Sequence, residues 1–175
     1  GRNATGGAIR ITTKAPGFGP VATLSASYGR FADVRLAAYG STGLSDNLAV
    51  SLAFFYADDE GYARNINTRN RVSDLNSLSL RGKLLFEPSE AVTFTLAGGH
   101  SERHSGAAFA LGVLDGNNSS VNLPGSVPAG DPREVSLTFD PVIDVKSSQA
   151  SLTAEFDLGF ASLSSISSYQ KTTTY

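Results

Sequence analysis

The 175-residue chain contains no cysteine and no methionine. Without cysteine it forms no disulfide framework, no thiolate metal site and no catalytic thiol. Without an initiating methionine, and with a start inside a glycine-rich pattern, we expect the chain to be an internal piece of a longer protein. A signal peptide is not recognisable at its start, which carries no weight for such a piece.

Long apolar runs are also missing. The most apolar stretch, residues 48–57, is interrupted by Ser51 and is far shorter than the roughly 18 residues of a membrane helix. A helical membrane protein is therefore excluded, but a membrane barrel is not, because a tilted spanning strand needs only about 9–11 residues with every second one apolar. The net charge of −2 lacks the basic excess of most nucleic-acid binders, so we expect no nucleic-acid partner.

Apolar residues instead recur with period two along most of the chain, which is the pattern of β-strands. The clearest runs lie at 48–56, 78–86, 92–97 and 150–158, and weaker ones lie at 21–31, 33–43 and 160–171. The sequence therefore predicts an all-β fold, an antiparallel meander of about seven strands. Period two places on one face Leu52, Phe54, Leu80, Leu84, Phe94, Leu152 and Phe156, and on the other Arg81, Lys83, Thr93, Thr95, Ser151 and Thr153.

The predicted connections alternate between short and long. Short turns fall at 43–47, 87–90 and 157–159, where Pro, Gly, Asn and Asp provide the turn chemistry. Long connections run over 58–76 and 103–147. Short turns at one end and long loops at the other are typical of outer-membrane barrels. In a compact soluble domain, a loop of roughly 40 residues would count against the strand assignment.

Residues 1–14, Gly-Arg-Asn-Ala-Thr-Gly-Gly followed by Ala-Ile-Arg-Ile-Thr-Thr-Lys, resemble the seam between plug and barrel in TonB-dependent outer-membrane receptors. In that family such a segment ends the plug, a short strand follows, here 8–14, and a Pro/Gly linker opens the barrel. The Leu-Ser-Asp turn within 43–48 and the Arg-Gly-x-Leu pattern of the hairpin at 80–89 are also similar to the family.

The resemblance implies that residues 1–14 end a plug domain, 15–20 are a linker, and 21–175 are the N-terminal part of a barrel, a fragment of a 22-stranded plugged transmembrane barrel. It implies a receptor of the bacterial outer membrane that takes up a scarce nutrient, such as a ferric siderophore, cobalamin or a glycan. TonB would act through the plug region that this chain lacks, and outer-membrane lipid would surround the barrel. An aromatic girdle would then include Tyr28, Tyr56, Phe86 and Tyr169.

Two alternatives remain open. A passive outer-membrane porin-type barrel shares the strands and loops but would lack a plug. A soluble all-β binding module would have to bury its apolar face against a second sheet.

The residues that bear chemistry do not form a known catalytic pattern. No G-x-S-x-G elbow occurs, and neither histidine has a triad context, so we expect no enzyme and no cofactor. On one strand His100 and His104 would share a face but lie about 13 Å apart, too far for one metal ion. The candidate ligand-binding residues, if the ligand is anionic, are the long-loop side chains Arg64, Arg69, Arg71, Arg103 and His104.

Overall fold

The computed structural model describes residues 12–106, 131 and 133–175. It consists of strands and one 3₁₀ turn: β1 (Val21–Tyr28), η1 (Arg30–Ala32), β2 (Val34–Ser45), β3 (Leu48–Asp59), β4 (Ala63–Asn65), β5 (Arg71–Val72), β6 (Leu75–Ser89), β7 (Val92–Ser105), β8 (Glu134–Val135), β9 (Ile143–Asp157) and β10 (Ser162–Thr174). Within the described ranges, no helix is long and apolar enough to cross a membrane.

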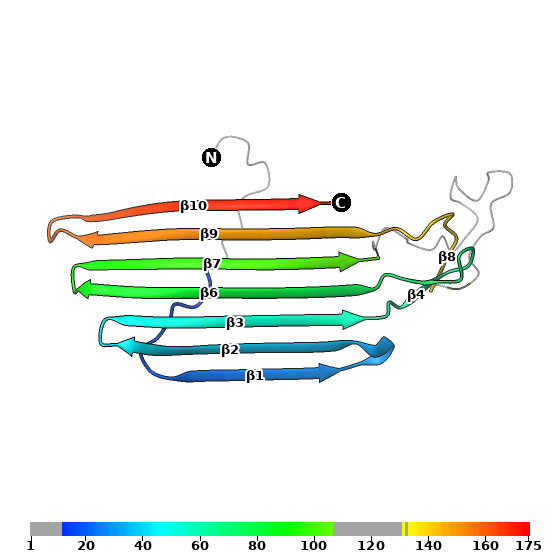
Figure 1. The fold of residues 1–175 in the computed structure, drawn as a ribbon, viewed down its shortest axis with the longest axis horizontal. Helices are drawn as coiled ribbons and strands as arrows, with labels where there is room; N and C mark the ends of the chain where they lie inside the picture. Colours follow the sequence, from blue (N-terminus) through cyan, green and yellow to red (C-terminus); the bar gives the residue numbers. More distant parts are fainter. Residues whose placement is uncertain (1–11, 107–130, 132) are drawn as a thin grey trace.

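Seven long strands form a single sheet in the order β1-β2-β3-β6-β7-β9-β10, and every neighbouring pair is antiparallel (Figure 1). The predicted all-β meander of about seven strands is therefore confirmed. The described sheet does not close on itself, because β1 and β10 are its two edges.

The strand ends differ from the prediction in detail. β7 continues to Ser105 and β9 begins at Ile143, so the strands reach several residues further towards the long connections than the apolar pattern indicated. β1 stops early, at Tyr28, because the next residues form the 3₁₀ turn η1. Inside this turn Phe31 and Ala32 have positive φ angles of 67° and 56°, which no continuing strand adopts.

Short turns join β2 to β3, β6 to β7 and β9 to β10 at one end of the sheet, while the longer connections lie at the other end (Figure 1). This arrangement agrees with the predicted alternation. The long connections are not free of secondary structure, however. They contain β4, β5 and β8, which form a small second sheet in the order β5-β4-β8, with β4 and β8 parallel.

The ladder registers confirm the predicted faces. Leu84 is directly opposite Val50 and Leu96, whereas its neighbour Lys83 is opposite Ser51 and Ala97 on the other side of the sheet. We call the side that carries Leu84 the apolar face and the side that carries Lys83 the polar face. The four aromatic residues of the predicted girdle all belong to the apolar face: Tyr28, Tyr56, Phe86 and Tyr169.

No second layer covers the apolar face within the described residues. Leu52 is 60% exposed and Leu80 is 54% exposed although both lie near the middle of the sheet. The only hydrophobic cluster of buried residues in the described part of the chain is small and belongs to the loop sheet: Ala63, Val72 and Val135, with Leu137 against them. In general, contiguous apolar surface of this extent is the kind that proteins use to contact lipid or another protein.

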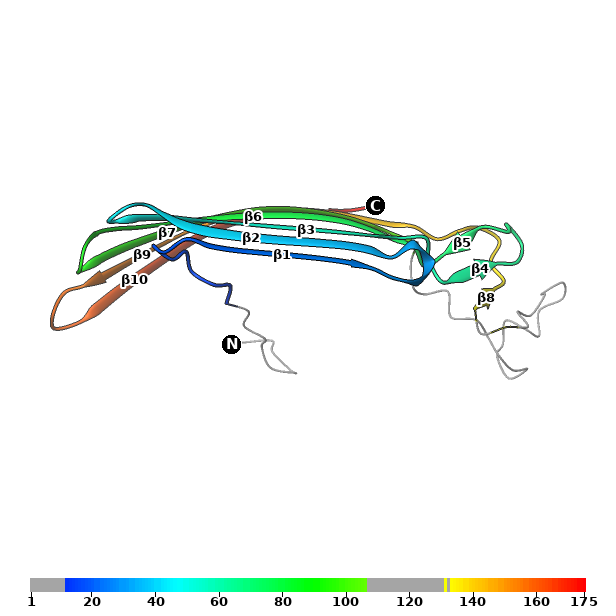
Figure 2. The ribbon, with the colours of Figure 1, turned by 90° about the horizontal axis from the view of Figure 1, so that it is seen from below.

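Residues 12–20 cross the polar face, below the sheet in Figure 2. The Lys83 ammonium donates to the carbonyls of Thr13 at 2.9 Å and Lys14 at 3.1 Å. Further along, the Gly17 amide donates to the Ser41 hydroxyl over 2.9 Å. The strand expected over 8–14 is absent at residues 12–14, because their backbone is held by a side chain rather than by a ladder. The expectation for 8–11, and the plug end at 1–11, lie outside the described residues.

Candidate functional site

The long connections meet at one end of the sheet and pack together there. The Arg64 amide donates to the Arg133 carbonyl over 2.7 Å, and the Ile66 amide donates to the Val135 carbonyl over 2.9 Å. These bonds join the segment after β3 to the segment before β9. The small apolar cluster around Val72 and Val135 lies beneath them, so the loops form a defined surface.

Asp140 holds part of this assembly together through three hydrogen bonds. Its carboxylate accepts bonds from the Asn65 amide at 2.8 Å, the Thr68 hydroxyl at 2.6 Å and the Asn70 amide at 2.6 Å. The Thr68 bond, then the Asn70 and Asn65 bonds, lower the pKa of Asp140 below its ordinary value. Asn65 itself is completely buried, and its side-chain oxygen Oδ1 accepts from the Leu137 backbone amide at 3.1 Å. One carboxylate therefore fixes the turn between β4 and β5.

Above this turn the loops enclose a pocket of about 430 Å³, which we call the arginine pocket. Its lining comprises four arginines, two carboxylates and two aromatic rings: Arg64, Arg69, Arg71, Arg133, Asp131, Glu134, Phe31 and Tyr62. The volume is in the range of small-molecule sites. Positive charges exceed negative ones by two in this lining, although the whole chain has a net charge of −2.

Phe31 supports the guanidinium groups of this region. Its ring lies 4.8 Å from the Arg30 guanidinium and 5.7 Å from that of Arg71, both within cation–π range. Arg71 also donates to the Gly61 carbonyl at 3.2 Å, so two contacts set its position. The connection between β1 and β2 is joined to the next loop as well, because the Glu60 amide donates to the Phe31 carbonyl over 2.9 Å.

Of the five candidate residues, three meet in the arginine pocket and two do not. Arg64, Arg69 and Arg71 line it together. Arg103 and His104 lie on β7, and as sequence neighbours in a strand they point to opposite sides of the sheet. Neither belongs to the pocket, because both are in the regular ladder with β9 rather than in the loops. The interpretation of Arg103 and His104 as loop residues is therefore wrong.

Polar side chains occupy the apolar face near the long loops. His104 lies 2.7 Å from the Asp144 carboxylate, and Glu102 accepts from His100 at 3.3 Å and from Lys146 at 3.2 Å. The histidines share one face, as predicted. Within the part of the chain that the structure describes, no group of three or more His, Cys, Asp or Glu residues is arranged to hold a metal ion. This patch consists of hydrogen bonds and one cross-strand ion pair, Glu102–Lys146, at the boundary of the apolar face.

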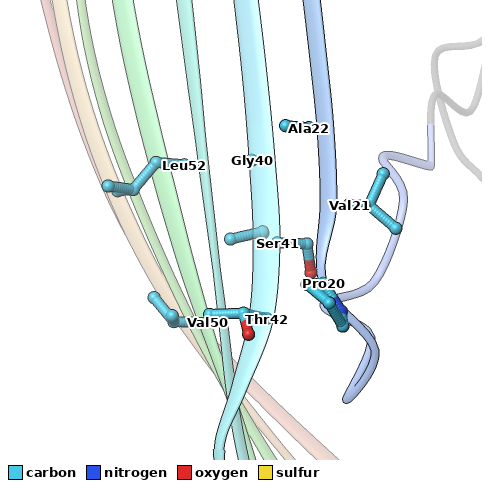
Figure 3. A pocket seen from close by; sticks show the side chains of 9 residues that line it. Pro20, Val21, Ala22, Gly40, Ser41, Thr42, Val50 and Leu52 are labelled. Atoms are coloured by element: carbon cyan, nitrogen blue, oxygen red, sulfur yellow. The ribbon is translucent and has the colours of Figure 1, made fainter.

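A second hollow, of about 460 Å³, lies at the start of the sheet (Figure 3). Its walls come from β1, β2, β3 and the linker residue Pro20. The surface is open there because Ala22 and Gly40, in line with Leu52 on the apolar face, have little or no side chain. None of the lining residues is charged, so the hollow offers no chemistry of its own.

The sequence did not reveal several residues of the loop site, among them Phe31, Arg133 and Asp140. Phe31 lies at the end of the run 21–31, which the apolar pattern predicts to be a strand. Its positive φ shows that the strand has ended before this residue. Arg133 and Asp140 lie about 70 residues from their loop partners, and no local pattern connects them. The proximity of Arg133 to Arg64 depends on the parallel pairing of β4 with β8.

The chain matches no protein-family model and no curated relative. The fold itself defines the class: an all-β protein whose seven-stranded antiparallel meander has one apolar face, one polar face and a loop assembly at one end.

Proposed function

We propose that the chain is the N-terminal part of the barrel of a TonB-dependent outer-membrane receptor, together with the end of its plug, and that the whole receptor takes up a scarce nutrient. The resemblance of residues 1–14 motivates the family. One observation carries the membrane part of the proposal: the apolar band on the sheet runs obliquely across the strands.

The band has the same length on distant strands. On β2 the apolar face is apolar from Val34 to Gly40, and on β9 it is apolar from Ala150 to Phe156. Beyond these limits the face becomes polar, for example at Ser148 on β9. β10 does not follow this pattern, because two serines interrupt the apolar residues on the same face of the strand.

The two stretches are displaced along the strand direction. Val34 is paired with Asp58 of β3, whereas Ala150 is in line with Leu52 of β3 through Gly98 and Gly82. A shift from position 58 to position 52 is about 20 Å along the strands, and the lateral distance over four strand spacings is about 19 Å. The band therefore crosses the strands at about 45°, close to the tilt of about 35–45° that strands have in outer-membrane barrels.

Other features agree with this arrangement. Phe86, Phe94 and Phe156 form an aromatic row at the turn end of the band, with ring centroids 6.4 Å and 5.9 Å apart. Such residues gather where a barrel meets the membrane surface. Lys83 lies on the polar face, where a water-filled or plugged lumen accepts charge that lipid does not. Its contact with Thr13 brings the segment before the linker to that same side.

The open edges β1 and β10 need further strands, since backbone groups in lipid must all be paired. The full receptor would supply them, and its remaining plug would carry the segment that TonB contacts. Under this proposal the loop assembly faces the outside and the arginine pocket contributes to ligand capture.

Polarised infrared spectroscopy on the chain in oriented lipid bilayers tests the membrane proposal. The expected result is a strand tilt of about 35–45° from the membrane normal. A chain that stays monodisperse in buffer without detergent, and does not bind bilayers, would contradict the proposal and favour the soluble binding module.

The sequence that precedes residue 1 tests the family: a plug domain with a TonB-contacting segment is expected, and a signal peptide directly before the strands would favour a porin.

A further inference from the structure

We propose that the arginine pocket binds a small ligand that carries two or more oxyanion groups, phosphates or carboxylates. The inference names the ligand class of the loop site, and it rests on the proposed function only for the statement that the pocket faces the outside.

The four arginines of the pocket are all exposed to solvent, but they differ in how far other side chains and carbonyls engage them. Arg71 is engaged by Phe31, by the Gly61 carbonyl and by Glu60, whose carboxylate lies 3.9 Å away. In contrast, the side chains of Arg64, Arg69 and Arg133 have no hydrogen bond or ion pair to any described residue.

These three arginines nevertheless line one cavity, from two different loops. Guanidinium groups provide planar, paired donors that match carboxylate and phosphate oxygens. Asp131 and Glu134 in the lining, together with Glu60 beside Arg71, neutralise part of the charge. Three guanidinium groups that converge on one cavity without a described partner favour a ligand with more than one oxyanion group.

The backbone around the pocket is strained. All non-glycine residues with positive φ in the described ranges lie in the connections that form the loop assembly: Phe31, Ala32, Arg69 and Ser73. Side chains other than glycine adopt this αL conformation at a cost, and such residues gather where a site positions its side chains. Arg69, with φ 67°, is itself a lining residue, so the surrounding loops hold its backbone in this conformation at the pocket.

Hydrogen bonds hold the backbone of the pocket arginines in place. The bond from the Arg64 amide to the Arg133 carbonyl fixes these two arginines relative to each other. The Asp140 carboxylate fixes the turn that carries Arg69 through Thr68 and Asn70. A ligand therefore meets arginines whose backbones are already in place, which reduces the entropy lost on binding.

The test is calorimetric titration of the full chain in an uncharged detergent at low salt, with pyrophosphate as the phosphate probe, tricarballylate as the carboxylate probe and acetate as a single-charge control. We expect at least one of the two probes to bind more tightly than acetate, and the tighter one identifies the oxyanion. Arg69→Gln and Arg133→Gln should each weaken binding about tenfold. Arg103→Gln removes the same charge from β7, outside the pocket, and should leave the affinity unchanged. Absence of binding by both probes, or equal losses in Arg103→Gln and Arg69→Gln, would overturn the proposal.

A measurement on the unmodified chain keeps the proposal testable if a variant misfolds. Phenylglyoxal modifies exposed arginines, and mass spectrometry locates the modified sites. Bound pyrophosphate or tricarballylate should protect Arg64, Arg69 and Arg133 but not Arg103, and equal labelling with and without both probes would overturn the proposal. These experiments use micelles, so they test the ligand class separately from the membrane proposal. Anion binding by a chain that does not insert into bilayers would support the ligand class and contradict the membrane receptor. Insertion into bilayers without anion binding would support the membrane receptor and contradict the ligand class.

Discussion

The side-chain amide of Asn65 donates to Asp140 over 2.8 Å, and this bond connects two loops across 75 residues of sequence. Asp140 makes no such bond to the main sheet, because its three donors are Asn65 at the end of β4 and Thr68 and Asn70 in the turn that follows. Replacing it by alanine should open the loop assembly without unfolding the strands. Trypsin should then cut after Arg69 and Arg71 several times faster, while the circular-dichroism signal of the sheet stays constant.

The matched control for this variant is Asp46→Ala, in the short turn between β2 and β3 at the opposite end of the sheet. It removes the same charge and should leave cleavage in the arginine pocket unchanged. Equal cleavage rates in Asp140→Ala and Asp46→Ala would contradict the role of the Asp140 carboxylate.

The same carboxylate predicts a pH dependence. Hydrogen bonds from Thr68, Asn70 and Asn65 hold the pKa of Asp140 below its ordinary value of 3.8. A lowered pKa means that the carboxylate's contribution to stability is fully present above pH 3.8 and is lost as the pH falls through the folded-state value. The side-chain amide resonance of Asn65 should therefore stay constant from neutral pH down to that range and move only below it. In Asp140→Asn this acid transition should disappear.

Lys83 predicts how firmly residues 12–20 are held to the sheet. Lys83→Met removes both bonds to the Thr13 and Lys14 carbonyls. We expect a loss of about 1 kcal/mol in the attachment of this segment, since the ammonium group is partly exposed, and hence roughly fivefold faster hydrogen exchange at the Gly17 amide. Arg81→Met is the control, because Arg81 lies on the same face and donates no hydrogen bond to residues 12–20. Equal exchange in both variants would show that Lys83 does not hold this segment.

The main sheet was predictable from sequence because its information is local. Leu84 and Lys83 differ in polarity and are adjacent, and period two alone assigns them to opposite faces. The loop assembly was not predictable, because β4 and β8 are two or three residues long and pair across about 70 residues. Arg64, Arg69 and Arg71 lie in the long connection where the sequence predicted them, while their role in binding stays a prediction. Arg103 and His104 lie in β7 instead, because this strand continues past the apolar pattern into residues that are polar on both faces.

Two adjacent leucines test which face meets lipid. Leu84 lies on the apolar face and Leu85 on the polar face. Under the membrane proposal, Leu84→Lys should weaken bilayer partitioning by about 2–4 kcal/mol, since lysine would enter the hydrocarbon region. Leu85→Lys adds the same charge beside Lys83 and should have a much smaller effect. Partitioning is measured by sedimentation with vesicles. A larger loss for Leu85→Lys would reverse the assignment of the faces.

The two glycines with positive φ separate backbone strain from steric conflict. Gly61 has φ 77°, and a Cβ there would collide with the Val72 carbonyl oxygen and the Asp74 amide. Gly159 has φ 78°, but no atom lies within 4 Å of the position of its Cβ. Gly159→Ala should therefore cost only the strain of the αL conformation, about 1–2 kcal/mol, confined to the turn between β9 and β10. Gly61→Ala adds the collision with backbone, which cannot move without displacing β5.

We expect Gly61→Ala to speed hydrogen exchange at the Arg64 and Ile66 amides, whose bonds to Arg133 and Val135 join the two loops. Gly159→Ala should leave both amides at the unmodified rate. Because Arg64 and Arg133 line the arginine pocket, Gly61→Ala should also weaken binding of the oxyanion probes even though it changes no charge. Unchanged exchange at Arg64 in Gly61→Ala would mean that the close approach of Gly61 to β5 does not position the pocket.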